Sequence, residues 1–151
     1  RLYFKPSSDL LTPEWYDNSP KFSGATHITV QVGQETAGKD AVLAAKGAIS
    51  GTVTAEGTGA AVSGCQVQVY NAAGIWSYSA TTASDGTYRV LLPAGDYRLY
   101  FKPSSDLLTP EWYDNSPKFS GATAIAVSAG IEEVANAELK NMFLLLGIRL
   151  K

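Results

Sequence analysis

One short group of residues in this 151-residue sequence has side chains suited to binding, and it occurs twice. The group comprises Trp112, Tyr113 and Asp114, and it recurs as Trp15, Tyr16 and Asp17. Aromatic rings beside a carboxylate suit a sugar, because the flat ring stacks on C–H groups while polar atoms bind hydroxyls. Alternatively, Trp112 or Tyr113 closes the open end of a β-sandwich, as large aromatics commonly do. The sequence does not fix which ring is exposed, so both interpretations stay open.

Side chains suited to catalysis are sparse. The sole histidine, His27, lies on the outward side of its predicted strand, and the second copy of the segment has Ala124 there. We therefore expect a surface residue rather than a base or a metal ligand. Cys65 shares one strand face with Val67 and Val69, which predicts a buried small hydrophobe rather than a nucleophile. No Ser-His-Asp order, Cys-x-x-Cys pair or phosphate-binding glycine loop is present, so we expect neither enzymatic activity nor a cofactor.

Calcium is the one metal for which the sequence offers a group of candidate ligands. Asp106, Glu111, Asp114 and Asn115 could supply oxygen atoms. They lack the alternating spacing of a known calcium-binding loop, so we expect no metal site.

The aromatic group lies in a segment that the chain contains twice, letter for letter. Arg1–Thr26 is identical to Arg98–Thr123, 97 residues later. A fold tolerates many substitutions at surface positions, so a perfect copy indicates a tandem repeat rather than a constraint of the fold. The repeating unit has the size of one small domain.

Alternating apolar residues predict short β-strands separated by turns. In the first part of the chain they lie at Leu2 and Phe4, across residues 27–32, and around residues 40–43. From Gly47 onward the same alternation continues, and Gly-, Pro-, Asn- and Asp-rich turns separate the runs. We therefore predict an all-β protein, a Greek-key β-sandwich of seven to eight strands, without a convincing helix.

The repeat also predicts the domain organisation. Residues 1–43 are interpreted as the C-terminal half of a module, 44–140 as one complete module, and 141–151 as a tail. The chain begins within a repeat and without a methionine, so we expect the natural protein to be longer. Its net charge of -2 provides no basic surface for nucleic acid. The longest apolar run, Met142 to Ile148, is too short to span a membrane.

The complete module carries a family resemblance. The stretch ISGTVTAEGTGAAVSGCQVQVYNAAG, followed by TTASDGTYRVLLPAGDYRLYFKP, resembles the carboxypeptidase regulatory-like (prealbumin-like) domain, a relative of the Cna-B repeats. The matching features are the G-x-V strand opening, the SDGTY turn, and the LPAGDYRL turn and strand. The resemblance covers about 47–140 fully and 1–43 as its second half. It implies a prealbumin-like sandwich and a role as a stalk, spacer or accessory module of a secreted or surface protein.

Relatives of the Cna-B type often carry a Lys–Asn isopeptide bond assisted by a buried acid. The resemblance places Phe101 where that acid would be expected, so we do not expect the bond here. Lys46 and Asn136 nevertheless lie near the corresponding ends of the module.

The half module raises a physical problem, because an isolated half sandwich leaves strand edges and an apolar face uncovered. Either residues 1–43 pack irregularly on their neighbour in a long array, or another chain supplies the missing strands and a head-to-tail polymer results. The Asp40–Leu43 and Asn136–Leu139 endings align, which places Leu145–Ile148 opposite Ile49–Thr52. The predicted assembly strand is therefore Leu144, Leu145, Leu146, Gly147 and Ile148. The alternative is an ordinary terminal extension that packs on its own domain.

These observations favour a structural function. We expect a repeat module of a secreted or cell-surface protein, forming a stalk, fibre or adhesin shaft, with other copies of itself as partners. The alternative is a carbohydrate-binding accessory module that uses the Trp-Tyr-Asp loop and binds glycans.

Overall fold

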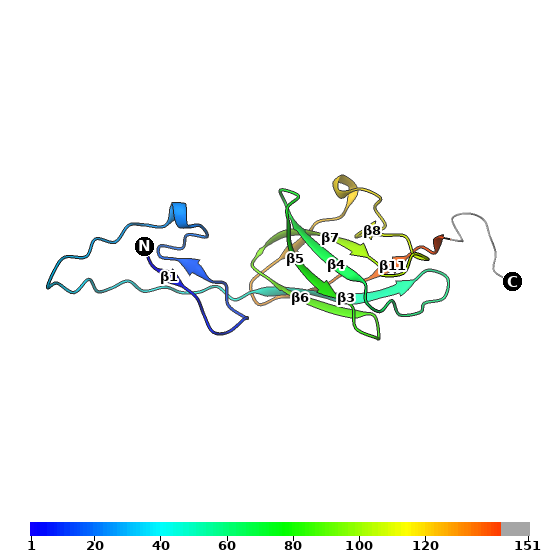
Figure 1. Ribbon diagram of the computed structural model, residues 1–151, viewed down its shortest axis with the longest axis horizontal. Coiled ribbons are helices and arrows are strands. Elements are labelled where there is room, and N and C mark those ends of the chain that lie inside the picture. Colours follow the sequence, from blue (N-terminus) through cyan, green and yellow to red (C-terminus); the bar gives the residue numbers. More distant parts are fainter. Residues whose placement is uncertain (143–151) are drawn as a thin grey trace. The chain divides into compact units, whose positions relative to one another are not determined.

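The computed structural model describes residues 1–142, which form β-strands, connecting loops and two short 3-10 helices (Figure 1). The chain divides into two compact units, Arg1–Lys46 and the residues from Gly47 onward. The predicted all-β sandwich is confirmed. No helix among the described residues is long and apolar enough to cross a membrane.

The first sheet of the second unit is organised around β3 (Gly47–Ala55). One edge of β3 pairs antiparallel with β6 (Thr87–Leu92). The other edge pairs in parallel with two short strands near the end of the unit, β10 (Glu132–Val134) and β11 (Ala137–Leu139). The first strand of the unit is therefore hydrogen-bonded directly to the last.

The second sheet forms the other layer of the sandwich (Figure 1). Strand β4 (Gln66–Asn71) lies between β5 (Trp76–Thr81) and β7 (Gly95–Lys102), antiparallel to both. The far edge of β7 pairs with β9 (Ile125–Val127) at one end and with β8 (Glu111–Trp112) at the other. Both edges of β7 are thus occupied.

The core lies between the two sheets and is filled by alternate residues of the strands, as the period of two requires. Its fully buried side chains are Ile49, Val53, Cys65, Val67, Val69, Leu92, Leu99, Phe101 and Leu139. The predicted burial of Cys65 beside Val67 and Val69 is confirmed.

Gly51 is required where the first strand meets the end of the unit. A Cβ atom at this position would collide with the carbonyl group of Ala135. The same carbonyl oxygen accepts a 2.5 Å hydrogen bond from the buried Tyr88 hydroxyl, and burial raises the pKa of that hydroxyl. Only a residue without a side chain permits this close approach.

The first unit contains equivalents of most of β7, of β8 and of the segment that follows them, but none of β3 to β6. Strands β1 (Tyr3–Phe4) and β2 (Glu14–Trp15) pair as β7 and β8 do, and the 3-10 helix η1 (Phe22–Gly24) follows. Among residues 1–46 only Ser19 and Ala25 are buried. The same sequence therefore buries much less surface here than in the second unit.

Two strands predicted in the first unit are absent. Residues 27–32 and 40–43 contain no β-strand, and Val32 is fully exposed. In the second unit the corresponding strands pair with Gly95–Tyr97 and with β3. Residues 1–46 contain no counterpart of either partner, and alternation alone does not stabilise an unpaired strand.

Equivalent segments of the two units make the same backbone contacts. The amide of Thr12 donates to the carbonyl of Ala44 at 2.8 Å, and that of Lys46 donates to Leu10 at 2.7 Å. In the second unit the amide of Thr109 donates to Lys140 at 2.8 Å, and that of Met142 donates to Leu107 at 2.9 Å. Residues 44–46 of the first unit and 140–142 of the second are thus bound to the loop that precedes β2 or β8.

The duplicated leucines test how far burial depends on the partner strands. Leu99 is fully buried, whereas the identical Leu2 is 43% exposed. We expect Leu99→Ala to lower the free energy of unfolding by about 2–5 kcal/mol because it opens a cavity in the core. Leu2→Ala should change it by less than about 0.5 kcal/mol. Urea denaturation followed by circular dichroism measures both free energies. Equal losses of unfolding free energy would contradict the conclusion that the burial of this leucine depends on the partner strands.

The buried thiol gives a second test. Burial raises the pKa of Cys65 to about 11, so only about one thiol in a thousand is ionised at pH 8. We expect Ellman's reagent to leave the native protein unmodified at pH 8 and to modify one thiol per chain in denaturant. Since the thiol pKa is higher in the folded state, the free energy of unfolding should also fall as pH rises from about 9 to about 11. Rapid native labelling would show that Cys65 is accessible.

Candidate functional site

The Trp-Tyr-Asp group of the second unit lies where β8 ends in a tight turn. The amide of Trp112 donates to the carbonyl of Ser116 at 2.9 Å, and the amide of Ser116 donates back to Trp112 at 3.1 Å. Between them Asp114 and Asn115 have φ angles of 65° and 55°. Aspartate and asparagine tolerate this left-handed conformation better than most residues, which explains why they occupy the turn.

A side-chain hydrogen bond fixes the carboxylate of the turn. The Thr123 hydroxyl donates to Oδ2 of Asp114 at 2.7 Å. In the first unit the Thr26 hydroxyl donates to Asp17 at 2.7 Å, and Asp17 and Asn18 also have positive φ angles. The loop therefore forms the same local structure with or without the rest of the sandwich.

Trp112 is half-buried in a cluster of aromatic rings. Its ring centroid lies 4.9 Å from Tyr70 on β4, 4.9 Å from Tyr100 on β7, and 5.2 Å from Phe119 in the 3-10 helix η2 (Phe119–Gly121). Such contacts are those of a packing residue. Sugar stacking on this ring stays a prediction.

Arg98 attaches η2 to the sheet. Its Nε donates to the carbonyl of Ala122 at 3.0 Å, and its guanidinium carbon lies 4.9 Å from the ring centroid of Phe119. Arg1 makes the equivalent contacts with Ala25 and Phe22, at 3.0 Å and 4.4 Å. An arginine over a ring combines cation–π attraction with a charged hydrogen bond.

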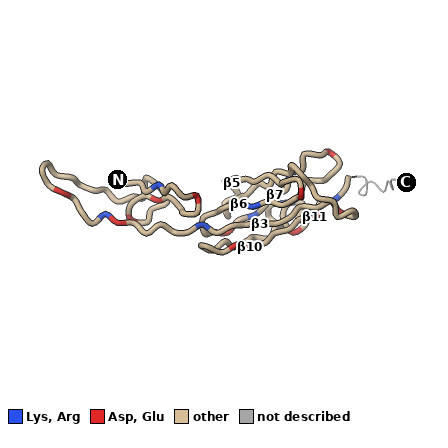
Figure 2. Tube along the Cα trace, turned by 90° about the horizontal axis from the view of Figure 1, so that it is seen from below, with Lys and Arg blue, Asp and Glu red and all other residues tan. Residues whose placement is uncertain are grey.

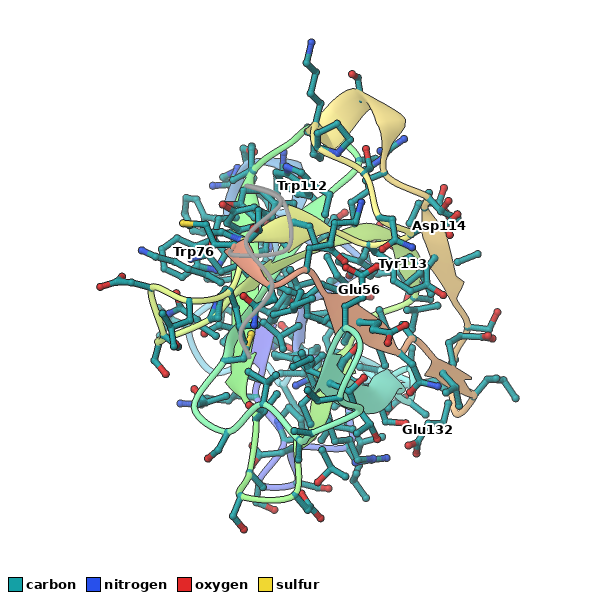
Figure 3. All side chains as sticks on the ribbon, turned by 90° about the vertical axis from the view of Figure 1, so that its right-hand side faces the viewer. Glu56, Trp76, Trp112, Tyr113, Asp114 and Glu132 are labelled. Carbon is teal, nitrogen blue, oxygen red and sulfur yellow. The ribbon has the colours of Figure 1, made fainter. Side chains whose placement is uncertain are left out.

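Tyr113 and Asp114 line a polar hollow away from the aromatic cluster. Figure 3 shows these two side chains on the side of the unit away from Trp76. The hollow has a volume of about 100 Å³, and its other lining residues are Glu111, Asn115 and Asn136–Glu138. The first unit has a counterpart of about 250 Å³, lined by Glu14, Tyr16, Asp17, Asn18 and Asp40–Val42.

One of the acids that line the hollow is buried. Glu111 is only 7% exposed, and its burial raises the pKa of the carboxyl group. The charge of Lys140 opposes this effect, whereas that of Glu56 adds to it. In the first unit, Oε1 of the equivalent Glu14 is buried without a hydrogen-bond partner among the described residues. The hollow can therefore offer hydrogen-bonding groups to a small polar ligand.

The other residues considered for chemistry are dispersed. His27 is exposed, and Cys65 is enclosed in the core. Within residues 1–142 no three acidic, histidine or cysteine side chains are placed to hold a metal ion. Two residues were named in connection with an isopeptide bond. Oδ1 of Asn136 accepts a 2.9 Å hydrogen bond from the amide of Thr52, and Phe101 is buried. The predicted assembly strand, residues 144–148, lies outside the described residues.

Sequence reasoning missed two features of this region. It did not predict that Asn136–Glu138 lie beside the turn at Asp114 or that Tyr70 packs against Trp112. Tyr70 follows Val67 and Val69 in a strand of alternating residues, so its outward side could be predicted but its partner could not. Over residues 1–142 the charged residues are scattered without a block of one sign, as Figure 2 shows.

The sequence and the fold were compared with known proteins. Residues 48–140 match the carboxypeptidase regulatory-like domain family, and no curated protein matches the chain. Among solved structures, the chain is similar to the group B streptococcus pilus 2b backbone protein, with 18% identity and a TM-score of 0.48 over 82% of this chain and 56% of that one. It is also similar to BcpA, the major pilin subunit of Bacillus cereus, with 15% identity and a TM-score of 0.46 over 66% of this chain and 32% of that one.

The Bacillus anthracis TIE protein is similar with 17% identity and a TM-score of 0.49, over 64% of this chain and 17% of that one. The chain thus spans between 17% and 56% of the lengths of these three proteins. The family match covers more than half of the 151 residues and coincides with the sandwich from β3 to β11. On this evidence the chain belongs to the carboxypeptidase regulatory-like domain family.

Proposed function

We propose that the chain is a structural repeat module of a secreted or cell-surface protein, forming part of a stalk, fibre or adhesin shaft. The observation that carries the proposal is the parallel pairing of β3 with β11. Because the first and last strands run in the same direction, the chain enters at the start of β3 and leaves beside its end. A module whose entry and exit lie at opposite ends suits a stalk in which modules are joined end to end.

The boundary between the units supports the same role. The amide of Lys46 is hydrogen-bonded to Leu10 of the first unit, and the next residue, Gly47, begins β3. Equivalent hydrogen bonds are made by the amides of Lys46 in the first unit and Met142 in the second. A repeated ending that leads directly into a strand suits an array of connected modules.

Assembly between copies is the finer part of the proposal. Residues 145–148 align with residues 49–52 of β3, and Gly147 aligns with Gly51, a position that cannot accept a Cβ atom. We propose that residues 144–148 act as a β3-like strand that joins the first unit of another copy. Residues 36–43 of that copy correspond to β10 and β11, the parallel partners of β3.

Carbohydrate binding is the second candidate function. The polar hollow recurs in both units, with a glutamate, a tyrosine, an aspartate and an asparagine at equivalent positions. Side-chain oxygens and amides around a tyrosine are groups that can bind sugar hydroxyls. On this reading Tyr113 and Asp114 contact the ligand, and Trp112 supports the turn.

The structural role predicts the dimensions of a multi-module chain. Residues 47–142 joined in two, three and four copies should add a constant increment per module to the maximum dimension. Strand β3 has nine residues, so the increment should be at least about 30 Å. Small-angle X-ray scattering measures it. A control with a ten-residue Gly-Ser linker at each junction should lose the regular increment, and a compact four-module particle would contradict the proposal.

A glycan array separates the two functions. The structural role predicts no saturable signal for the full chain. Carbohydrate binding predicts a signal that falls at least about tenfold when Asp17 and Asp114 are both replaced by alanine. The variant with Asp9 and Asp106 replaced is the matched control, because these aspartates are equally duplicated and exposed but do not line the hollow. A signal insensitive to both pairs would exclude the hollow.

A further inference from the structure

Glu111 occupies a position that faces the core of the second unit. In the pairing of β7 with β8 it lies opposite Phe101, which is fully buried. Residues directly opposite each other on paired strands share one face of the sheet, so the side chain of Glu111 lies on the core side of β8. Glu111 is 7% exposed, whereas glutamates are almost never buried unless they are paired. On packing grounds alone, an apolar residue would suit this position better.

The carboxylate of Glu111 has no hydrogen-bond donor among residues 1–142. Lys140 acts on it through its charge but forms no ion pair with it, since the one ion pair in the described part of the chain joins Arg89 to Glu132. Burial raises the pKa of the carboxyl group, as expected where the charged form is poorly solvated. A buried carboxylate without a donor is costly, so this group can be stabilised by a ligand that brings one.

The hollow that Glu111 lines is negatively charged. Two exposed acids, Asp114 and Glu138, line it as well, and none of the described residues around it is basic. A metal ion does not fit, because within residues 1–142 the acids are not placed to coordinate one. An ammonium group has three N–H donors on a rotatable bond and needs no fixed coordination geometry. The hollow therefore suits an organic cation.

The first unit contains a similar group of acids. Glu14 lies opposite Phe4 as Glu111 lies opposite Phe101, and Glu14, Asp17 and Asp40 line the first hollow without a basic residue among its described lining. Asp40 lies outside the duplicated segment, and the residue that aligns with it in the second unit is Asn136. The third acid of each hollow thus comes from a different position, and its presence in both is not a consequence of the duplication.

We propose that the hollow binds an amino sugar, one that carries a free primary ammonium group in place of a hydroxyl or an N-acetyl group. The ammonium group donates to the carboxylate of Glu111, and Tyr113, Asp114 and Asn115 contact the adjoining part of the sugar ring. This inference rests on the carbohydrate-binding function proposed for the same hollow, and it names the class of sugar. A charged donor bonds a carboxylate more strongly than a hydroxyl does, so the buried acid distinguishes amino sugars from neutral ones.

Two matched oligosaccharides test the proposal. The probes are fluorescently labelled tetramers of glucosamine and of N-acetylglucosamine, titrated with the full 151-residue chain and followed by anisotropy. At about pH 6 the free amines are protonated, whereas acetylation removes their charge. We expect saturable binding of the glucosamine tetramer and at least about tenfold weaker binding of the acetylated one. Equal affinities, or no saturable binding of the glucosamine tetramer, would overturn the proposal.

A double variant tests the role of the buried acids. Glu14→Gln combined with Glu111→Gln removes both charges with little change in volume, and it should weaken binding of the glucosamine tetramer at least about tenfold. The free energy of unfolding should stay the same or rise, because a buried charge without a partner is costly. Unchanged binding together with lower stability would give these acids a structural role only and overturn the proposal.

Asp9→Asn combined with Asp106→Asn is the matched control. These two acids are equally duplicated and exposed but do not line either hollow, so their replacement should leave binding unchanged. The control variant loses the same net charge as the double glutamine variant. Equal losses of affinity in the two variants would show a general attraction of a polycation to an acidic chain, and they would overturn the proposal.

An oligolysine peptide separates the sugar from its charge. Acetylated tetralysine amide carries the same charge as the glucosamine tetramer without the rings and hydroxyls, and we expect it to bind at least about tenfold more weakly. Equal affinity would overturn the assignment to a sugar. If neutral glycans bind on the array and amino sugars are not preferred, this inference fails and the carbohydrate-binding function stands. None of these outcomes bears on the scattering increment of joined modules.

Discussion

The pairing of β4 with β7 is the interaction on which the complete module depends. It joins β4, and with it β5, to the duplicated segment that contains most of β7. The apolar side chains Leu99 and Phe101 of this segment are fully buried in the core. The first unit contains the same residues without this pairing, and there Leu2 remains substantially exposed. Burial in this fold is therefore determined by partners that are distant in sequence, and the local sequence provides only the alternation that makes burial feasible.

The local hydrogen bonds of the duplicated segment, unlike its burial, do not depend on β3 to β6. The turn at Asp114 and Asn115, its bond to Thr123 and the contact of Arg98 with Ala122 all recur in the first unit. All of these partners lie within the duplicated 26 residues. The segment thus forms a preorganised loop structure on its own, and completing the sandwich mainly adds core packing to it.

The sequence predicted those features that depend on alternation and turns. The strands around Val67, Val69, Leu99 and Val127 and the burial of Cys65 follow from a period of two. The same rule failed at residues 27–32, because a strand also needs a partner and none is available in residues 1–46. The hollow beside Tyr113 could not be predicted either. Residues 136–138 line it, as residues 40–42 line the hollow of the first unit, where no β3 is present. In both units the segment that follows these residues is hydrogen-bonded to the loop before β2 or β8, and such a contact between distant residues leaves no local signal in the sequence.

The contact between Gly51 and Ala135 explains why the module closes where it does. The Ala135 amide donates to Ser50 at 2.8 Å, and its carbonyl accepts the Tyr88 hydroxyl, so both sides of this residue are bonded to the first sheet. The last strand is thereby held against the first before the chain leaves the module. A unit that ties its end to its beginning has no need of the next unit for its own core. Modules of this kind can be added or duplicated without disturbing their neighbours, which is the physical condition for a chain that repeats 26 residues without a change.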